Sequence, residues 1–355
     1  MKIIVTKQLI ESILINLQPF LEKKDASQIT AHIFLEAENN SCIIKATDSE
    51  IGLLIKTDNI IIEEEGTITA NGKKLLDIIR ILKDTDIILE KIDDNLYIQQ
   101  NKSKFRLPIF NFENFPSFPN IKNKSQISLD SINLINAFKS ISSSIDSNNP
   151  KYELNGALLN IKNDRTEIVG TDTRRLSVVT IKNSSEKQLS LIIPKKAIIE
   201  IQKLFVERIN IYYDETNLII NNSNYYLFSK LINGQFPNYE RIIPSQSRYR
   251  VTLPKKKMLN SIKMITTISQ EIKIIFTKES ILFESLATDN IEAKTELLTP
   301  TGLDDDFEIN VNSRFLLDFI SQIDGDRFEI ALNEPTLPFV LKDKQFITVI
   351  MPIIV

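Results

Sequence analysis

The feature that most constrains this fold is an internal repeat that runs three times along the chain. A Thr-Asp pair, preceded by a small residue, occurs once in each third of the sequence. A helical segment follows each pair, and its opening basic residue lies 25, 24 and 25 residues after the aspartate. Because two features keep the same spacing, we infer three copies of a unit of about 120 residues. The pairs are Ala46-Thr47-Asp48, Gly170-Thr171-Asp172 and Ala287-Thr288-Asp289, and the basic residues are Lys73, Lys196 and Arg314.

Each copy is predicted to form a strand, a helix, several strands, a second helix and several further strands. The first helices begin at Thr6, Asp130 and Pro254, which suit a helix N-terminus. Apolar residues then recur at the 3.6-residue helical period, as at Ile10, Ile13, Leu14 and Leu17; Leu134, Phe138 and Ile141; Leu75, Leu76 and Ile79; Ile198, Ile199 and Leu204; Leu316 and Ile320. Residues 217–230 alternate as antiparallel strands do. We therefore predict an α+β protein with domains at residues 1–122, 123–246 and 247–355.

Basic residues gather on the polar faces of the second helices. Lys73 and Arg80 lie seven residues apart and point to one side of a helix, and Lys196 and Lys203 repeat this arrangement. The formal net charge is -3, so these cations are concentrated on particular faces of an acidic chain. Such faces are what a sequence-independent DNA-binding surface needs. The alternative is that they are ordinary solvated helix faces.

Several other classes of protein are disfavoured. The single cysteine, Cys42, excludes an intrachain disulfide and fits a reducing compartment, so we expect a cytoplasmic protein. The single histidine, His32, has no triad partners, and one cysteine with one histidine cannot form a zinc site. No stretch of about 18 apolar residues is present to span a membrane. We expect no catalytic site, cofactor or metal, and interpret Asp304-Asp305-Asp306 as an exposed turn and the Thr-Asp pairs as recurring turn bonds. A three-domain hydrolase would need catalytic residues that the sequence does not offer.

Longer motifs resemble the bacterial DNA polymerase III β subunit, the sliding clamp, over the whole chain. They are Leu154-Asn155-Gly156, the segment 170–176, Phe228-Ser229-Lys230-Leu231, Gly234-Gln235-Phe236-Pro237-Asn238-Tyr239 with Arg241 and Pro244, and Val349-Ile350-Met351-Pro352. The resemblance implies a DNA-clamp fold and a head-to-tail homodimer of six domains, with helices lining the hole and sheets outside. Such a ring encircles duplex DNA and tethers the replicative polymerase. The alternative from another class is a ring-shaped peptide-binding adaptor that is never loaded on DNA.

The resemblance also implies a pocket between the second and third domains, here called the peptide site. The replicative polymerase, the clamp loader and repair polymerases would insert a short linear motif there. The matching residues are Leu154, Thr171, Thr173, Arg174, Arg175, Leu176, Pro237, Arg241, Ile242, Asn312, Phe315, Val349, Met351, Pro352, Ile353, Ile354 and Val355. The alternative is that residues 351–355 are merely an edge strand of the last domain.

Further residues match the family's DNA-contacting and ring-interface positions. The DNA set is Lys24, Lys73, Arg80, Lys151, Tyr152, Lys196 and Lys203, and the interface set is Phe105, Leu107 and Ile268. The chain also departs from the family. Thr173-Arg174-Arg175 replaces the usual Gly-His-Arg, which predicts a bulkier and more basic rim, and Ile354-Val355 replaces Arg-Leu.

Overall fold

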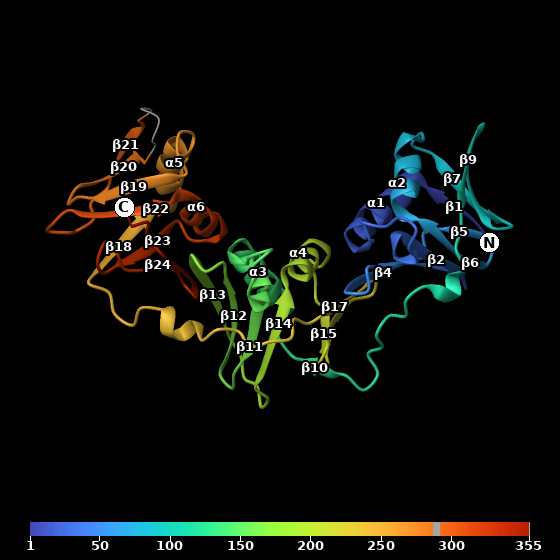
Figure 1. Ribbon diagram of the computed structural model, residues 1–355, viewed down its shortest axis with the longest axis horizontal. Helices are drawn as coiled ribbons and strands as arrows, with labels where there is room; N and C mark the ends of the chain where they lie inside the picture. Colours follow the sequence, from blue (N-terminus) through green and yellow to red (C-terminus); the bar gives the residue numbers. More distant parts are fainter. Residues whose placement is uncertain (287–291, 355) are drawn as a thin grey trace. The chain divides into compact units, whose positions relative to one another are not determined.

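The computed structural model describes residues 1–286 and 292–354 (Figure 1). The third Thr-Asp copy, Ala287-Thr288-Asp289, and the peptide-site residue Val355 therefore lie outside the described residues. Strand, helix, strands, helix and strands follow one another three times, which confirms the predicted order and the α+β class. The chain divides into two compact units, Met1–Ile132 with Glu200–Leu231, and Asn133–Ile199 with Ile232 onward. The units share the second repeat between them, and the predicted domain boundaries stay a prediction.

The first unit contains two antiparallel sheets. A five-stranded sheet has the order β5-β1-β7-β8-β9, and an eight-stranded sheet has the order β10-β15-β16-β17-β4-β3-β2-β6. In the second sheet, β17 of the second repeat pairs with β4 of the first. The strands are β1 (Lys2–Thr6), β2 (His32–Glu38), β3 (Ser41–Thr47), β4 (Ile51–Thr57), β5 (Ile61–Glu64), β6 (Gly66–Asn71), β7 (Asp86–Ile92), β8 (Asn95–Gln100), β9 (Ser103–Pro108), β10 (Ser125–Ile127), β15 (Asn210–Tyr213), β16 (Asn217–Asn221) and β17 (Tyr225–Lys230).

Two helices of the first unit, α1 (Lys7–Leu17) and α2 (Gly72–Ile81), pack against each other (Figure 1). The predicted apolar stripes are buried, because Ile10, Leu14 and Leu17 of α1 and Leu75 and Ile79 of α2 have no exposed surface. Side-chain oxygens cap both N-termini. The amide of Leu9 donates to Thr6 Oγ1, and that of Lys74 donates to Asn71 Oδ1 at 3.0 Å.

The second unit repeats this plan. Its eight-stranded sheet has the order β14-β11-β12-β13-β25-β24-β23-β18, and its four-stranded sheet the order β21-β20-β19-β22. The strands are β11 (Gly156–Ile161), β12 (Arg165–Thr171), β13 (Arg175–Lys182), β14 (Leu189–Pro194), β18 (Tyr249–Pro254), β19 (Glu271–Phe276), β20 (Ser280–Ser285), β21 (Lys294–Leu298), β22 (Phe307–Asn312), β23 (Arg327–Leu332), β24 (Phe339–Asp343) and β25 (Phe346–Ile350). The helices α5 (Lys255–Thr266) and α6 (Ser313–Gln322) pack against each other, as α1 and α2 do.

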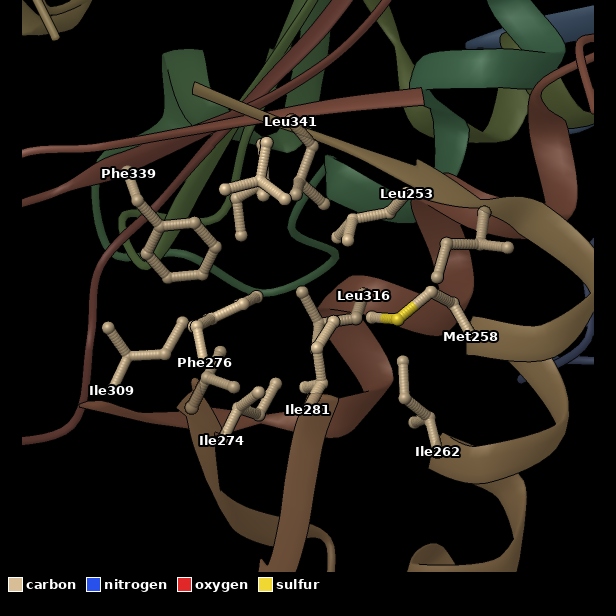
Figure 2. Packing of buried hydrophobic residues seen from close by; sticks show 14 of the residues in the cluster. Leu253, Met258, Ile262, Ile274, Phe276, Ile281, Ile309, Leu316, Phe339 and Leu341 are labelled. Carbon is tan, nitrogen blue, oxygen red and sulfur yellow. The ribbon is translucent and has the colours of Figure 1, made fainter. Parts of the chain in front are cut away.

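The core of the third repeat shows how helices and strands share one apolar interior. Met258 and Ile262 of α5 and Leu316 of α6 are in one cluster with side chains from both sheets of the unit, such as Phe276 and Leu341 (Figure 2). The exposed surface of every one of these residues is 3% or less. This burial is the main stabilising term for the third repeat.

The two helices of the second repeat, α3 (Ser131–Ile141) and α4 (Lys195–Leu204), follow the predicted pattern with one correction. Ile199 was placed in the apolar stripe of α4 but is 42% exposed. The buried face is filled by Ala197, Ile198, Ile201 and Leu204, whose spacing leaves Ile199 on the solvent side. Asp304, Asp305 and Asp306 are exposed just before β22, as predicted. Within the part of the chain that the structure describes, no helix has the length and apolar character needed to cross a membrane.

Candidate functional site

A tight turn at Thr171–Arg175 connects β12 to β13 and begins the peptide site. Thr171 Oγ1 donates to the carbonyl oxygen of Arg175 at 2.6 Å and accepts from the amide of Thr173 at 3.1 Å. Asp172 Oδ1 accepts from the amides of Arg174 and Arg175 at 3.1 and 3.0 Å. The Thr-Asp pair thus supplies the hydrogen bonds that close this turn.

The same bonds occur in the first repeat. Thr47 Oγ1 donates to the carbonyl oxygen of Ile51 at 2.9 Å, and Asp48 Oδ1 accepts from the amides of Glu50 and Ile51 at 3.0 Å each. The predicted recurring turn is therefore confirmed for the two copies that lie within the described residues. Ser49 and Thr173 occupy the same place in the turn with φ of 74° and 72°. A β-branched residue is costly there, so the turn bonds hold Thr173 in a strained conformation.

Arg175 is the most heavily bonded side chain of the turn. Its Nε donates to Asp172 Oδ2 at 3.0 Å, its Nη1 donates to Asp318 Oδ2 at 2.7 Å, and its Nη2 donates to the carbonyl oxygen of Ser143. The guanidinium carbon also lies 4.5 Å from the ring centroid of Phe315. These contacts join the turn to α6 and to the segment after α3.

Arg175 adds no net charge to the rim of the peptide site. Its side chain is 4% exposed and lies against two carboxylates, so its charge is compensated inside the unit. Arg174 is exposed and carries the rim charge. Sequence reasoning also missed the role of Asp318 in this cluster. The signal was its position in α6, four residues after Arg314, where the other repeats place Asp77 and Glu200.

The floor of the peptide site is the junction of β13 and β25. Leu176 pairs directly with Val349, and both are 2% exposed. After β25 the chain leaves the sheet, because the amide of Met351 donates to the carbonyl oxygen of Arg174 at 3.0 Å and that of Ile353 donates to the carbonyl oxygen of Asn310 at 2.7 Å. The described residues 351–354 are in no strand, and β25 is an inner strand. The edge-strand alternative was therefore wrong.

A short 3₁₀ helix, Tyr239–Ile242, forms another part of the site. Tyr239 is buried, and its hydroxyl donates to Glu167 Oε2 at 2.5 Å. Burial, with Glu167 beside it, raises the pKa of Tyr239 to about 12, so the phenol stays a donor. Burial raises the pKa of Glu167, but hydrogen bonds from Lys162, Tyr239 and Arg165 outweigh burial, so the pKa lies below its usual value. This network, which sequence reasoning missed, holds the helix that carries Arg241 and Ile242.

Every described residue of the peptide site lies in the second unit. Leu154, Leu176, Val349 and Pro352 are buried, whereas Thr171, Pro237, Asn312, Phe315 and Ile353 are partly exposed. The exposed apolar side chains are Ile242 at 45%, Met351 at 41% and Ile354 at 73%. Leu176, Val349 and Tyr239 share one apolar cluster, against which Phe236 and Ile243 pack. The site is thus a buried apolar floor with exposed apolar and basic side chains at its rim, a chemistry that suits an apolar peptide.

The predicted DNA-contacting residues are all exposed. Lys73 and Arg80 lie on the solvent face of α2, and Lys196 and Lys203 on that of α4. Arg80 Nε lies 3.9 Å from Glu11 Oε1, and Lys203 Nζ lies 3.7 Å from Glu200 Oε2. Exposed pairs of this kind are weak, so the faces remain available to phosphates.

Two loops carry the remaining DNA-contact candidates. Lys24 follows the first helix, and Lys151 lies next to Tyr152, whose side chain is 65% exposed. The Leu154-Asn155-Gly156 motif orders the second loop, because Asn155 Oδ1 accepts from the amide of Asn149 at 2.7 Å and its Nδ2 donates to the carbonyl oxygen of Asn149 at 3.0 Å.

Two of the three predicted ring-interface residues lie on the terminal strand of a sheet. Phe105 and Leu107 are on β9, the terminal strand of the five-stranded sheet, but Leu107 is only 7% exposed. Ile268 is 45% exposed just after α5, which packs on β21, the terminal strand of the four-stranded sheet. Leu298 of β21, which sequence reasoning did not select, is 74% exposed.

Comparisons with known proteins match the chain over its whole length. Residues 1–119, 128–238 and 240–354 match the models of the N-terminal, central and C-terminal domains of the DNA polymerase III beta subunit. The beta sliding clamp of Helicobacter pylori strain J99 is 40% identical over 352 residues, covering 97% of this chain and 94% of the relative. That of Chlamydia muridarum is 25% identical over 366 residues, covering 99% and 98%.

Solved structures agree. The Helicobacter pylori beta clamp bound to a DNA ligase peptide is 40% identical and superposes with a TM-score of 0.92, with all of both chains covered. The DNA polymerase III beta subunit of Pseudomonas aeruginosa shares the fold at 20% identity, with a TM-score of 0.88 and the same full coverage. The threefold repeat, its paired helices and these matches over the whole length together show that the chain belongs to the DNA polymerase III beta subunit family, the beta sliding clamps.

Proposed function

We propose that two copies of this chain close head to tail into a ring around duplex DNA and tether the replicative polymerase to it. The observation that carries the proposal is the repeated helix pair. In each described pair one face is buried on the sheets while the other carries exposed cations, among them Lys73, Arg80, Lys203 and Lys263. Such faces would line the hole and contact phosphates without reading sequence. The chain would act without catalysis, in the cytoplasm, as a processivity factor.

The two terminal strands support the head-to-tail closure. Strand β9 carries the exposed cations Lys104 and Arg106. Strand β21 carries the exposed carboxylate of Glu296 and the exposed apolar side chain of Leu298. Each ends its sheet, so its outward amides and carbonyls have no strand partner among the described residues. Pairing β9 of one copy with β21 of the next would satisfy these groups and cover Leu298.

The peptide site supports the tethering role. A relative has been solved with a DNA ligase peptide bound, and this chain presents Ile242, Met351 and Ile354 around an apolar floor. Burying one Leu and one Phe of a partner there would contribute roughly 1.5–3 kcal/mol each before ordering costs. We therefore expect replicative and repair polymerases and the clamp loader to bind weakly and exchange.

Retention on DNA tests the proposal. The ring should be loaded with its clamp loader on closed circular DNA and then washed with salt, before and after the circle is cut. Because the link is topological, retention should survive salt on the closed circle and be lost when the circle is cut. Equal retention on cut and closed circles would refute encirclement, and a dimer that binds motif peptide but is never retained would favour the adaptor alternative.

A further inference from the structure

A water-accessible hollow of ≈ 340 Å³ lies beside the peptide site in the second unit. Arg174 and Phe315, which belong to the peptide site, are in its wall together with Lys195 at the start of α4 and Arg314 at the start of α6. Its charged lining residues are Asp146, Asp172, Arg174, Arg175, Lys195 and Arg314. We call it the cationic hollow.

The positive charges in the cationic hollow outnumber the negative ones. Arg175 is compensated by Asp172 and Asp318 at 3.0 and 2.7 Å. Within the described part of the chain, no carboxylate lies within 4.0 Å of the guanidinium of Arg174 or Arg314. Both side chains are exposed and can turn toward a ligand in the hollow.

Lys195 supplies a third, partly buried cation. Its ammonium donates to the carbonyl oxygen of Ile145 at 2.5 Å and to Ser147 Oγ at 3.0 Å. Burial lowers the pKa of Lys195, and although Asp146 opposes this, Arg175 and Arg314 lower it further. Asp172 also opposes the lowering, so burial, rather than repulsion from the arginines, is its main cause. An anion beside this partly buried ammonium would be stabilising, because burial disfavours a charge that lacks a nearby opposite charge.

We propose that the cationic hollow binds the carboxylate of an Asp or Glu that flanks the apolar motif of a partner peptide. The inference rests on the proposed peptide site and deepens it. The hollow adjoins the peptide site, which favours a peptide over a DNA phosphate as its ligand. It shares Asn312 and Phe315 with that site, and the carbonyl oxygen of Arg174 accepts a hydrogen bond from the amide of Met351. A peptide whose Leu and Phe rest on the apolar floor places its next residues within reach of Arg174 and Arg314.

Three synthetic peptides test this, each with the same Leu and Phe anchors. One carries Glu before the anchors, one carries Glu after them, and the parent carries Gln at both places. Affinities are measured by fluorescence anisotropy for the full-length protein, for the double variant Arg174→Gln/Arg314→Gln, and for Lys278→Gln/Lys342→Gln. The control removes two exposed cations of the same unit that lie outside the hollow and the peptide site.

We expect one acidic peptide to bind the unmodified protein about fivefold more tightly than the parent at low salt, because two exposed charge pairs together contribute little more than this. The preference should shrink as salt rises. The Arg174→Gln/Arg314→Gln variant should bind the acidic peptide no more tightly than it binds the parent peptide, whatever its affinity for the parent, and the control should keep the preference.

Equal affinity of all three peptides for the unmodified protein would overturn the hollow but leave the peptide site intact. Failure of every peptide to bind would overturn both. If the arginine variant kept the peptide preference but bound linear duplex more weakly than the control, the hollow would be a DNA contact instead, which also refutes the proposal.

Discussion

Replacing Arg175 with Met removes the cation that joins the Thr171–Arg175 turn to α6 while keeping a side chain of similar length. Arg175 is 4% exposed and donates to Asp172, Asp318 and the carbonyl oxygen of Ser143. In the variant, two carboxylates that are only 21% and 26% exposed would lie close together without a cation. Repulsion and incomplete hydration of these groups should loosen the junction of the second and third repeats.

The expected cost follows from this burial. Removing one partner of a buried ion pair typically costs about 3–5 kcal/mol, whereas an exposed pair contributes under about 1 kcal/mol. Arg250 offers a matched control, because it lies 3.6 Å from Glu329 with a side chain that is 61% exposed. Arg250→Met should therefore change stability little. Arg175→Lys should remain destabilising, because an ammonium cannot reproduce the three directed hydrogen bonds.

Urea unfolding followed by circular dichroism measures the loss of stability. Fluorescence anisotropy of a motif peptide under native conditions measures the effect on peptide binding. We expect a lower unfolding midpoint for Arg175→Met than for Arg250→Met. We also expect weaker peptide binding, because the turn that holds Met351 through the carbonyl of Arg174 is no longer anchored. If Arg175→Met and Arg250→Met unfolded at the same midpoint, the buried cluster would not stabilise this unit and the reasoning would be refuted.

Three further predictions concern other parts of the chain. His32 is buried against Phe110 with its Nδ1 unbonded in the described structure, and burial, with Lys74 nearby, lowers the pKa of His32 from 6.5 to about 4. The unfolded chain protonates His32 at a higher pH than the folded chain does, so the free energy of unfolding should fall as pH drops below 6.5, by about 1 kcal/mol between pH 7 and 5.5. His32→Phe should abolish this contribution to the shift of the urea midpoint with pH. A variant whose midpoint shifted as much as that of the unmodified protein would contradict the prediction. Leu298→Glu should weaken the dimer in analytical ultracentrifugation. Ile61→Glu on β5, the terminal strand at the other end of the five-stranded sheet from β9, should leave the dimer intact, and equal masses of the two variants would rule out closure through β21. Neutralising Lys73, Arg80, Lys196 and Lys203 together should impair processive synthesis without unfolding the protein, whereas each single change should matter little, since exposed charges each contribute under about 1 kcal/mol; normal processivity of the quadruple variant would show that these faces do not line the hole.

Local patterns in the sequence determined the repeating part of this protein. The helices at Lys7–Leu17, Gly72–Ile81 and Ser313–Gln322 follow from apolar periodicity, and their start residues from side chains that accept the first free amides. The Thr-Asp turn follows from bonds that span only two to four residues. All of these interactions join residues that are close in sequence, so each copy of the repeat contains the residues that determine its own helices and turn.

The candidate site needed more than these patterns. Its residues were selected because motifs such as Gly234-Gln235-Phe236-Pro237 resemble a family, and neither composition nor periodicity would have gathered them. The tertiary structure decided that Leu176 faces Val349 across paired strands, and that Arg175 is buried against Asp318, 143 residues away. Strand register between distant segments, and the burial of a charge at such a junction, depend on which surfaces meet once the repeats have folded. No local pattern in the chain specifies those partners, because they are joined only through packing and hydrogen bonds that form in three dimensions.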